Sequence, residues 1–240
     1  MALGDTVQYA GEYKLEECNL LSSTGVLARL DSNVIEINIY ENIFTNSLQL
    51  SLVLVDQNNL IMNMPVVGQE FVSLKLSTPG VGTFDFTENV FSVYKVASRQ
   101  DLSSGTQIYE LQLISPETLR NNRTRISKSY TGLTSEIVEK ILRDENLINT
   151  KKDIHIDETS RIRKFVAPNL RPNKFIGHLM RESTSKNYGG SPHYLFYETT
   201  KGFNFRVLDS LYEEPFKGKY VASEPLEVDG ENKRNNLEKD

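Results

Sequence analysis

Two segments near the start of the chain alternate apolar and polar residues with the two-residue period of a β-strand. The apolar side of residues 34–40 carries Ile35, Ile37 and Ile39, and that of residues 48–55 carries four leucines. The opposite, polar sides carry Glu36, Asn38, Gln49 and Ser51. Because successive strand side chains point to opposite faces, both segments are predicted to be half-buried strands. The turn-forming residues between them predict a hairpin or a connection around a barrel corner.

Apolar residues alternate again at residues 71–76, 84–86 and 108–114, and residues 90–97 have the composition of a strand. The polar residues 98–105 between the last two segments are predicted to be a hairpin loop. Six or so strands separated by turns within about eighty residues are typical of an antiparallel barrel or sandwich.

The pattern becomes helical at Ser115. Ser115-Pro116-Glu117 predicts a helix start, with a capping hydroxyl, proline at the first helical position and an acid in the first turn. Residues 134–143 predict a second helix, because their apolar residues repeat every three or four positions. A third helix is predicted from Pro172 onward, with four apolar residues on its buried side, Phe175, Ile176, Leu179 and Met180.

These patterns divide the chain into three parts and place it in the α+β class. Residues 1–114 are expected to form an antiparallel barrel or sandwich. Residues 115–212 are expected to form a helix-containing α+β unit, which ends in a hairpin of residues 194–198 against residues 203–208. Residues 213–240 are acidic, polar and without periodicity, so they are predicted to be a linker or disordered tail.

Composition and charge narrow the class of protein. The 240 residues are 38% hydrophobic with a mean hydropathy of −0.40, which is ordinary for a soluble globular chain. The net charge of −5 argues against a general nucleic-acid binder, which normally has a basic excess. No segment has the roughly 20 apolar residues of a membrane helix, and residues 1–6 lack a signal-peptide pattern. We therefore expect a protein made in a cytosol, without stable membrane association. Cys18 is the only cysteine, so no intrachain disulfide can form.

The histidines were considered as metal ligands. His155 lies between Asp153 and Asp157, which on a strand would share its face, but a solvated strand face is the better interpretation because no second ligand cluster accompanies it. His178 fits a packing or surface position, and His193 lies in a loop. No nucleotide-binding, nucleophile-elbow or zinc-protease motif is present. The chain is therefore expected to be non-enzymatic, with no catalytic residue, cofactor or metal.

Four cations lie within nine residues that contain no acid, Arg120, Arg123, Arg125 and Lys128. Three interpretations are open: a solvated surface, a protein interface, or a phosphate-binding patch for nucleic acid. The stretch has little interleaved aromatic content, which weakens the single-strand binding interpretation.

The order of these features resembles the central baseplate hub protein of contractile-tailed phages, of the T-even type and its relatives in cyanobacterial phages. The resemblance is carried by residues 34–60, 66–76, 90–96, 109–119, 125–132 and 168–180. It implies a tube-type β-barrel followed by an inserted unit, in a structural homotrimeric ring of the virion tail baseplate. The ring is expected to assemble in the host cytoplasm. It would join the tail tube to the membrane-piercing spike, with DNA as passing cargo in its lumen.

The resemblance also implies partners, and this chain differs from the family in one respect. The expected partners are the spike protein, tail tube or tube-initiator proteins and other baseplate proteins. The family carries two tube-type domains per chain, whereas one is expected here, so either the sequence is a fragment or truncated product, or the second domain is absent. Under this hypothesis Glu36, Asn38, Gln49 and Ser51 line the lumen, and the four cations of residues 120–128 face a partner.

Two other functions were weighed. One is a stand-alone β-rich binding module for a host-surface glycan or protein, which a concave pocket lined by Tyr and Asp would support. The other is a hydrolase, for which the sequence offers no convergent acid–base or nucleophile arrangement.

Overall fold

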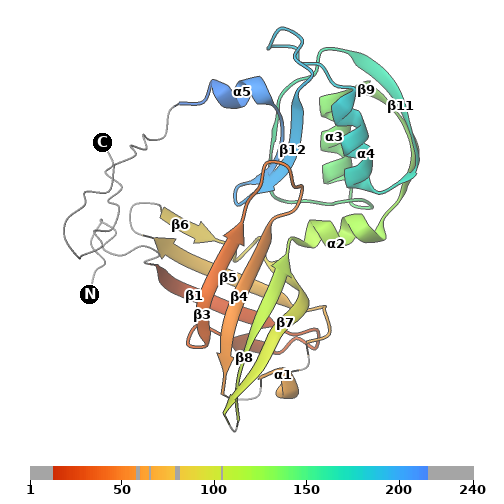
Figure 1. Cartoon of the computed structure of the whole chain (residues 1–240). Helices are drawn as coiled ribbons and strands as arrows, with labels where there is room; N and C mark the ends of the chain where they lie inside the picture. The colour runs from red at the N-terminus through yellow and green to blue at the C-terminus, as the bar shows by residue number, and fades with distance from the viewer. Residues whose placement is uncertain (1–12, 58–59, 65, 79–81, 104, 216–240) are drawn as a thin grey trace, which may run out of the picture.

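The computed structural model describes residues 13–57, 60–64, 66–78, 82–103 and 105–215. A strongly curved sheet forms one unit, and a mixed unit of helices and strands is stacked on it (Figure 1). The elements of the first unit are β1 Lys14–Leu21, β2 Leu27–Arg29, β3 Val34–Tyr40, β4 Gln49–Asp56, α1 Leu60–Asn63, β5 Phe71–Thr78, β6 Gly82–Asp85, β7 Phe91–Ser103 and β8 Thr106–Ile114. Those of the second are α2 Pro116–Arg123, β9 Ile126–Leu133, α3 Thr134–Arg143, β10 Asp153–Ile156, β11 Ile162–Leu170, α4 Pro172–Arg181, β12 Tyr194–Thr199, β13 Gly202–Val207 and α5 Leu208–Tyr212.

The first unit is an eight-stranded antiparallel sheet wrapped around one hydrophobic core. Its strands follow the order β2-β1-β5-β7-β8-β4-β3, with β6 paired to β5. The predicted hairpin of β3 and β4 is confirmed, with Asn38 opposite Ser51. The alternating leucines of β4 lie in the core, and so do the apolar residues predicted to face inward from β5 and β8. Because one face of each strand is buried, apolar and polar residues alternate along these strands in the sequence.

The expected closed barrel is not formed by the strands that the structure describes. The sheet ends at β2 and β3, and no ladder joins these two strands. β2 is only three residues long, and the chain then turns back on Leu30, which accepts hydrogen bonds from the N–H groups of Asn33 and Val34. This turn sends β3 to pair with β4, so the sheet curls around its core with two free edges.

Two local predictions in the sheet were wrong. Ile35 was placed on the apolar side of its strand but is 52% exposed, because the pairing register shifts between Val34 and Glu36. Such a bulge adds one residue, so Val34, Ile37 and Ile39 pack against the core while Ile35 is left outside it. Residues 98–105 were predicted to be a loop, yet β7 continues to Ser103 and pairs with β8 through further register shifts.

The second unit has three layers. Its three-stranded sheet, β10-β13-β12, forms one layer, α3 and α4 lie in the middle, and the two-stranded ribbon of β9 and β11 forms the outer layer (Figure 1). One hydrophobic core fills the spaces between the layers. The helix of residues 134–143, the helix from Pro172 and the final hairpin are confirmed. The ribbon was not predicted.

Candidate functional site

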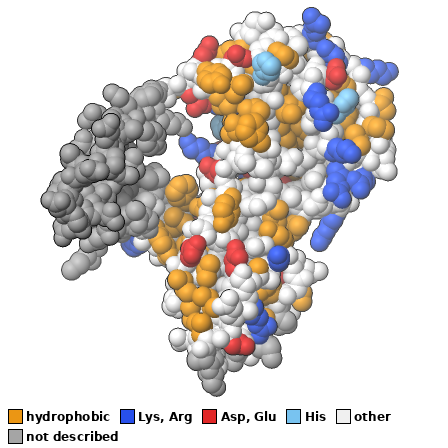
Figure 2. Space-filling view, in the orientation of Figure 1, with side chains coloured by type: hydrophobic (Ala, Val, Ile, Leu, Met, Phe, Trp, Pro, Cys, Tyr) orange, Lys and Arg blue, Asp and Glu red, His pale blue; other side chains and the backbone are white. Residues whose placement is uncertain are grey.

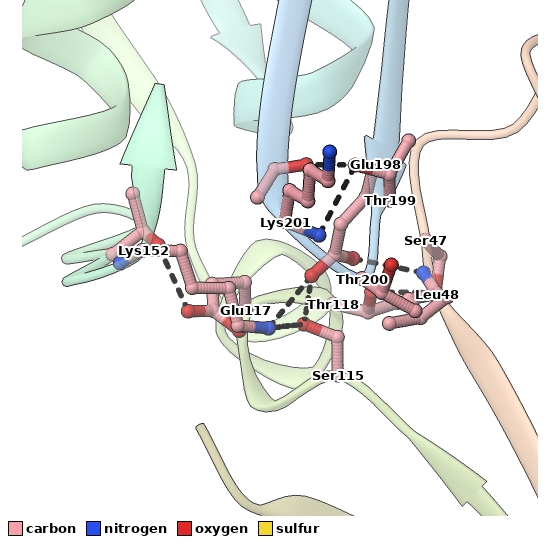
Figure 3. A network of polar contacts seen from close by, with 12 residues as sticks. Ser47, Leu48, Ser115, Glu117, Thr118, Lys152, Glu198, Thr199, Thr200 and Lys201 are labelled. Carbon is pink, nitrogen blue, oxygen red and sulfur yellow. Dashed lines mark hydrogen bonds and ion pairs between the residues drawn. The ribbon is translucent and has the colours of Figure 1, made fainter. Parts of the chain in front are cut away.

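The two units meet at a buried polar cluster, which we call the junction cluster (Figure 3). Lys152 Nζ lies 2.7 Å from Glu198 Oε1 and 3.1 Å from Glu117 Oε2. It also donates to Ser115 Oγ at 2.9 Å. The second carboxylate oxygen of Glu198 accepts the backbone N–H of Leu48 at 2.8 Å. β12, the start of α2, the segment before β10 and the start of β4 are therefore tied together at one point.

Ser115 has a different role from the predicted one. It stands at the N-cap of α2 but makes no side-chain capping hydrogen bond. Instead, its hydroxyl lies 2.6 Å from Glu117 Oε2 and 2.8 Å from Glu198 Oε1. The hydroxyl thus binds the junction cluster rather than the helix backbone.

The junction cluster holds two carboxylates and one ammonium, all at least nine-tenths buried. Burial raises the pKa of Glu198, and the attraction of Lys152 offsets only part of this effect. Burial would also raise the pKa of Glu117, but the Lys152 ammonium and the Ser115 hydroxyl outweigh it, so the Glu117 pKa lies below its usual value. The Lys152 ammonium is therefore the positive charge that compensates both buried carboxylates.

Sequence reasoning missed the junction cluster, although one signal was present. Glu198 shares a strand face with Tyr194 and Phe196, both of which are buried. A carboxylate at the third position of a buried face requires a buried partner. Nothing in the sequence indicates that this partner is Lys152, 46 residues earlier.

The residues proposed to line a lumen lie on the outer, polar face of β3 and β4. Asn38 Nδ2 donates to Glu36 Oε1 at 2.7 Å and to Ser51 Oγ at 3.2 Å, so three of the four side chains form one connected group. Glu36 and Gln49 are exposed, whereas Ser51 is 3% exposed. Gln49 lies next to Tyr40 on the neighbouring strand, apart from that group.

The four cations of the basic stretch do not form one cluster. Arg120 donates to the backbone carbonyls of Ile148 and Asn149, at 3.0 and 2.9 Å. Arg123 lines a groove between α2 and the sheet. Lys128 lies on the ribbon, with Nζ 5.6 Å from the centre of the Tyr130 ring.

Arg120→Ala is expected to destabilise the chain by about 1 to 3 kcal/mol, because it removes both charged hydrogen bonds to the turn after α3. Arg125→Ala is the matched control, since Arg125 is exposed and should change the free energy of unfolding by less than about 0.5 kcal/mol. Urea denaturation of the two variants checks this. Equal effects would show that Arg120 is also only a surface residue.

A polar groove of about 750 Å³ lies beside the β10-β13-β12 sheet and is lined by Asp157 and Tyr197, among others. Asp157 accepts hydrogen bonds from the Val207 N–H, at 2.8 Å, and from the Ser210 hydroxyl. Tyr197 is 5% exposed. Because the acid is engaged and the ring is buried, this groove offers no stacking platform for a sugar.

The structure also bears on metal binding, on the reactivity of the cysteine and on membrane crossing. Among the described residues, no three His, Cys, Asp or Glu side chains are grouped so as to hold a metal ion. Cys18 is fully buried, and burial raises the pKa of its thiol to about 12. In the described part of the chain, no helix is long and apolar enough to cross a membrane.

Comparison with solved structures shows a similarity of fold to a prophage tail protein. The 43 kDa tail protein of prophage MuSo2 from Shewanella oneidensis matches 79% of this chain and 52% of its own, with a TM-score of 0.52 and 10% identity. The tail protein from Neisseria meningitidis MC58 matches 89% of this chain and 53% of its own, with a TM-score of 0.49 and 10% identity. The E. coli c3393 protein, a component of the type VI secretion system, matches 81% and 48%, with a TM-score of 0.43 and 12% identity.

The chain spans about half the length of these solved structures. No protein-family model matches the sequence, and no curated protein matches it. The mostly antiparallel α+β architecture of this chain is thus similar in fold to the 43 kDa tail protein of prophage MuSo2.

Proposed function

We propose that this chain is a structural component of a phage tail baseplate, where it forms a central hub ring that joins the tail tube to the membrane-piercing spike. The observation that carries the proposal is the fold shared with a prophage tail protein over 79% of the chain. Within the described residues, the curved antiparallel sheet up to Ile114 would supply one wall segment per copy, and residues 115–212 would supply the attached unit. Most of the predicted tail of residues 213–240 lies outside the described residues. Three copies would form the ring, as a virion component assembled in the host cytoplasm.

The polar outer face of β3 and β4 supports a wall that faces a lumen between copies. Glu36, Asn38, Gln49 and Ser51 lie on the polar face of β3 and β4, while the leucines of β4 fill the core behind them. The wall unit is acidic: residues 13–114 contain 11 Asp or Glu and 5 Lys or Arg. Such a wall would repel DNA phosphates and let DNA pass without binding.

The attached unit has the opposite charge balance, which supports a role in partner binding. Residues 115–215 contain 17 Lys or Arg and 13 Asp or Glu. Figure 2 shows cationic side chains gathered along the side of this unit where Figure 1 places β9 and β11. We propose Arg123, Arg125 and Lys128 as contacts to the spike, tube or other baseplate proteins, whereas Arg120 binds the turn after α3 of its own unit.

Ring formation is tested by the mass of the full chain, alone and co-expressed with the spike protein, using multi-angle light scattering. We expect three times the 27.3 kDa of one chain. A single-chain mass under both conditions, with no spike retained, would contradict the hub ring.

The lumen wall is tested by cysteine labelling of the assembled ring. The native Cys18 is buried and its thiol pKa is raised to about 12, so an introduced cysteine should react selectively. We expect Gln49→Cys to react with a small maleimide but not with a polymer-linked maleimide too large to enter the ring. Thr83→Cys, on the exposed strand β6, should react with both reagents. Reaction of Gln49→Cys with the large reagent would place this face outside.

A further inference from the structure

The ribbon joins two basic segments that lie far apart in the sequence. Residues 123–133 and 161–171 together contain seven Lys or Arg and no Asp or Glu. The antiparallel register of β9 and β11 places them side by side, with Lys164 opposite Thr131 and Val166 opposite Ser129. The ribbon therefore brings the cations of both segments onto one surface, where Arg163 forms an ion pair with Glu182, just after α4, at 3.1 Å.

The outer face of the ribbon is uncovered. Tyr130, Phe165 and Ala167 point inward and pack in the core with α3 and α4. Ile162, Lys164 and Val166 alternate with these residues and point outward. Ile162 is 75% exposed and Val166 is 66% exposed. The face thus presents an apolar, a basic and an apolar side chain at successive outward positions of β11.

The strand that carries this triplet also has a free edge. Among the described strands, β11 pairs only with β9. An unpaired edge offers backbone N–H and C=O groups to an added strand. The side chains of an added strand would lie about 5 Å from Ile162, Lys164 and Val166.

The side chains on this surface favour protein over nucleic acid. Single-stranded nucleic acid needs exposed aromatic rings on which bases stack, and both aromatic side chains of the ribbon face inward. Phosphates would be attracted by the cations but would leave Ile162 and Val166 in water. A protein segment with apolar and acidic residues satisfies both kinds of side chain.

We infer that the free edge and outer face of β11 form a docking site for an extended, acidic protein segment, one that places a carboxylate at Lys164 between apolar side chains at Ile162 and Val166. The inference extends the partner interface proposed above, but the surface acts in an isolated chain as well as in a ring. Its test therefore measures binding by the isolated chain, so its failure is distinct from failure of the hub ring.

The test is a charge swap with labelled peptides, followed by fluorescence anisotropy at low salt. The probe is a peptide whose central residues are Val-Thr-Glu-Thr-Val, and its counterpart carries Lys in place of Glu. The wild-type chain is expected to prefer the Glu peptide. Lys164→Glu should weaken Glu-peptide binding by about tenfold and reverse the preference, because an attraction across paired strands becomes a repulsion. Val166→Ser should weaken both peptides.

Lys201→Glu is the matched control, because Lys201 is exposed on the β12–β13 turn and makes the same charge change away from the ribbon. It should leave peptide binding within about twofold of the wild type. Equal effects of Lys164→Glu and Lys201→Glu, or no binding by the wild type, would overturn the inference. Tighter binding of a single-stranded DNA oligonucleotide, lost in Lys164→Glu but kept in Val166→Ser, would replace it with a nucleic-acid site.

Discussion

Lys152→Met is expected to destabilise the chain by about 3 to 5 kcal/mol at neutral pH, because it leaves two buried carboxylates without their cation. Methionine is similar in length to lysine, so the loss is one of charge and hydrogen bonds rather than of packing volume. The free energy of unfolding in urea, measured by circular dichroism, gives the effect.

The destabilisation should shrink as the pH falls. In the wild type, the Glu117 pKa is lowered, so the stability that Glu117 contributes is present above about pH 4.3 and is lost as the pH falls through the lower folded value. Glu198 acts in the opposite direction, since its raised pKa favours folding at lower pH. In the variant, both carboxylates lose Lys152 and gain protons on folding, so acid stabilises the variant relative to the wild type.

Two further variants make the Lys152 result specific. Glu198→Gln keeps an oxygen for Lys152 and leaves one ammonium with one carboxylate, so a smaller loss of about 1 to 2 kcal/mol is expected. Lys151→Met changes an exposed neighbour and should have an effect below about 0.5 kcal/mol. A loss for Lys152→Met that is no larger than that for Lys151→Met, or that is independent of pH, would mean that the junction cluster contributes little to stability.

Gly202→Ala is expected to destabilise the second unit by about 3 kcal/mol or more. Gly202 begins β13 with a φ of +136°, and a Cβ there would lie 2.2 Å from the backbone carbonyl oxygen of Asp153. That oxygen belongs to β10, which pairs in parallel with β13, so relief of the clash requires the two strands to separate. Hydrogen exchange should report the loss at β10, β12 and β13.

Gly105→Ala separates the cost of the backbone angle from that of the clash. Gly105 also has a positive φ, +88°, but nothing lies within 4 Å of its added Cβ. About 1 kcal/mol is therefore expected there. Because the two units have separate cores, Gly202→Ala should leave exchange in β4 and β8 nearly unchanged. Uniform loss of protection across both units would show instead that the junction cluster couples them into one cooperative unit.

The sequence was informative where one face of an element is buried. The leucines of β4, the inward residues of β8 and the apolar residues of α3 repeat with the period of their element, so their burial was predicted. The prediction from the sequence was wrong at Ile35, because a register shift leaves this side chain outside the core without any change in composition. It also failed at the ribbon, because the outer side of β11 carries the exposed apolar residues Ile162 and Val166, which blur the alternation.

By itself, the sequence determined the types of the elements that bury one regular face, the change from strands to helices at Ser115, and the charge of each part, because these depend on neighbouring residues along the chain. Only the tertiary structure decided which distant groups meet. It paired Lys152 with Glu117 and Glu198, and it laid residues 161–171 against residues 123–133. The first arrangement depends on packing, because a buried charge must be paired with an opposite charge that lies next to it in the folded chain. The second depends on strand pairing between segments that are far apart in the sequence.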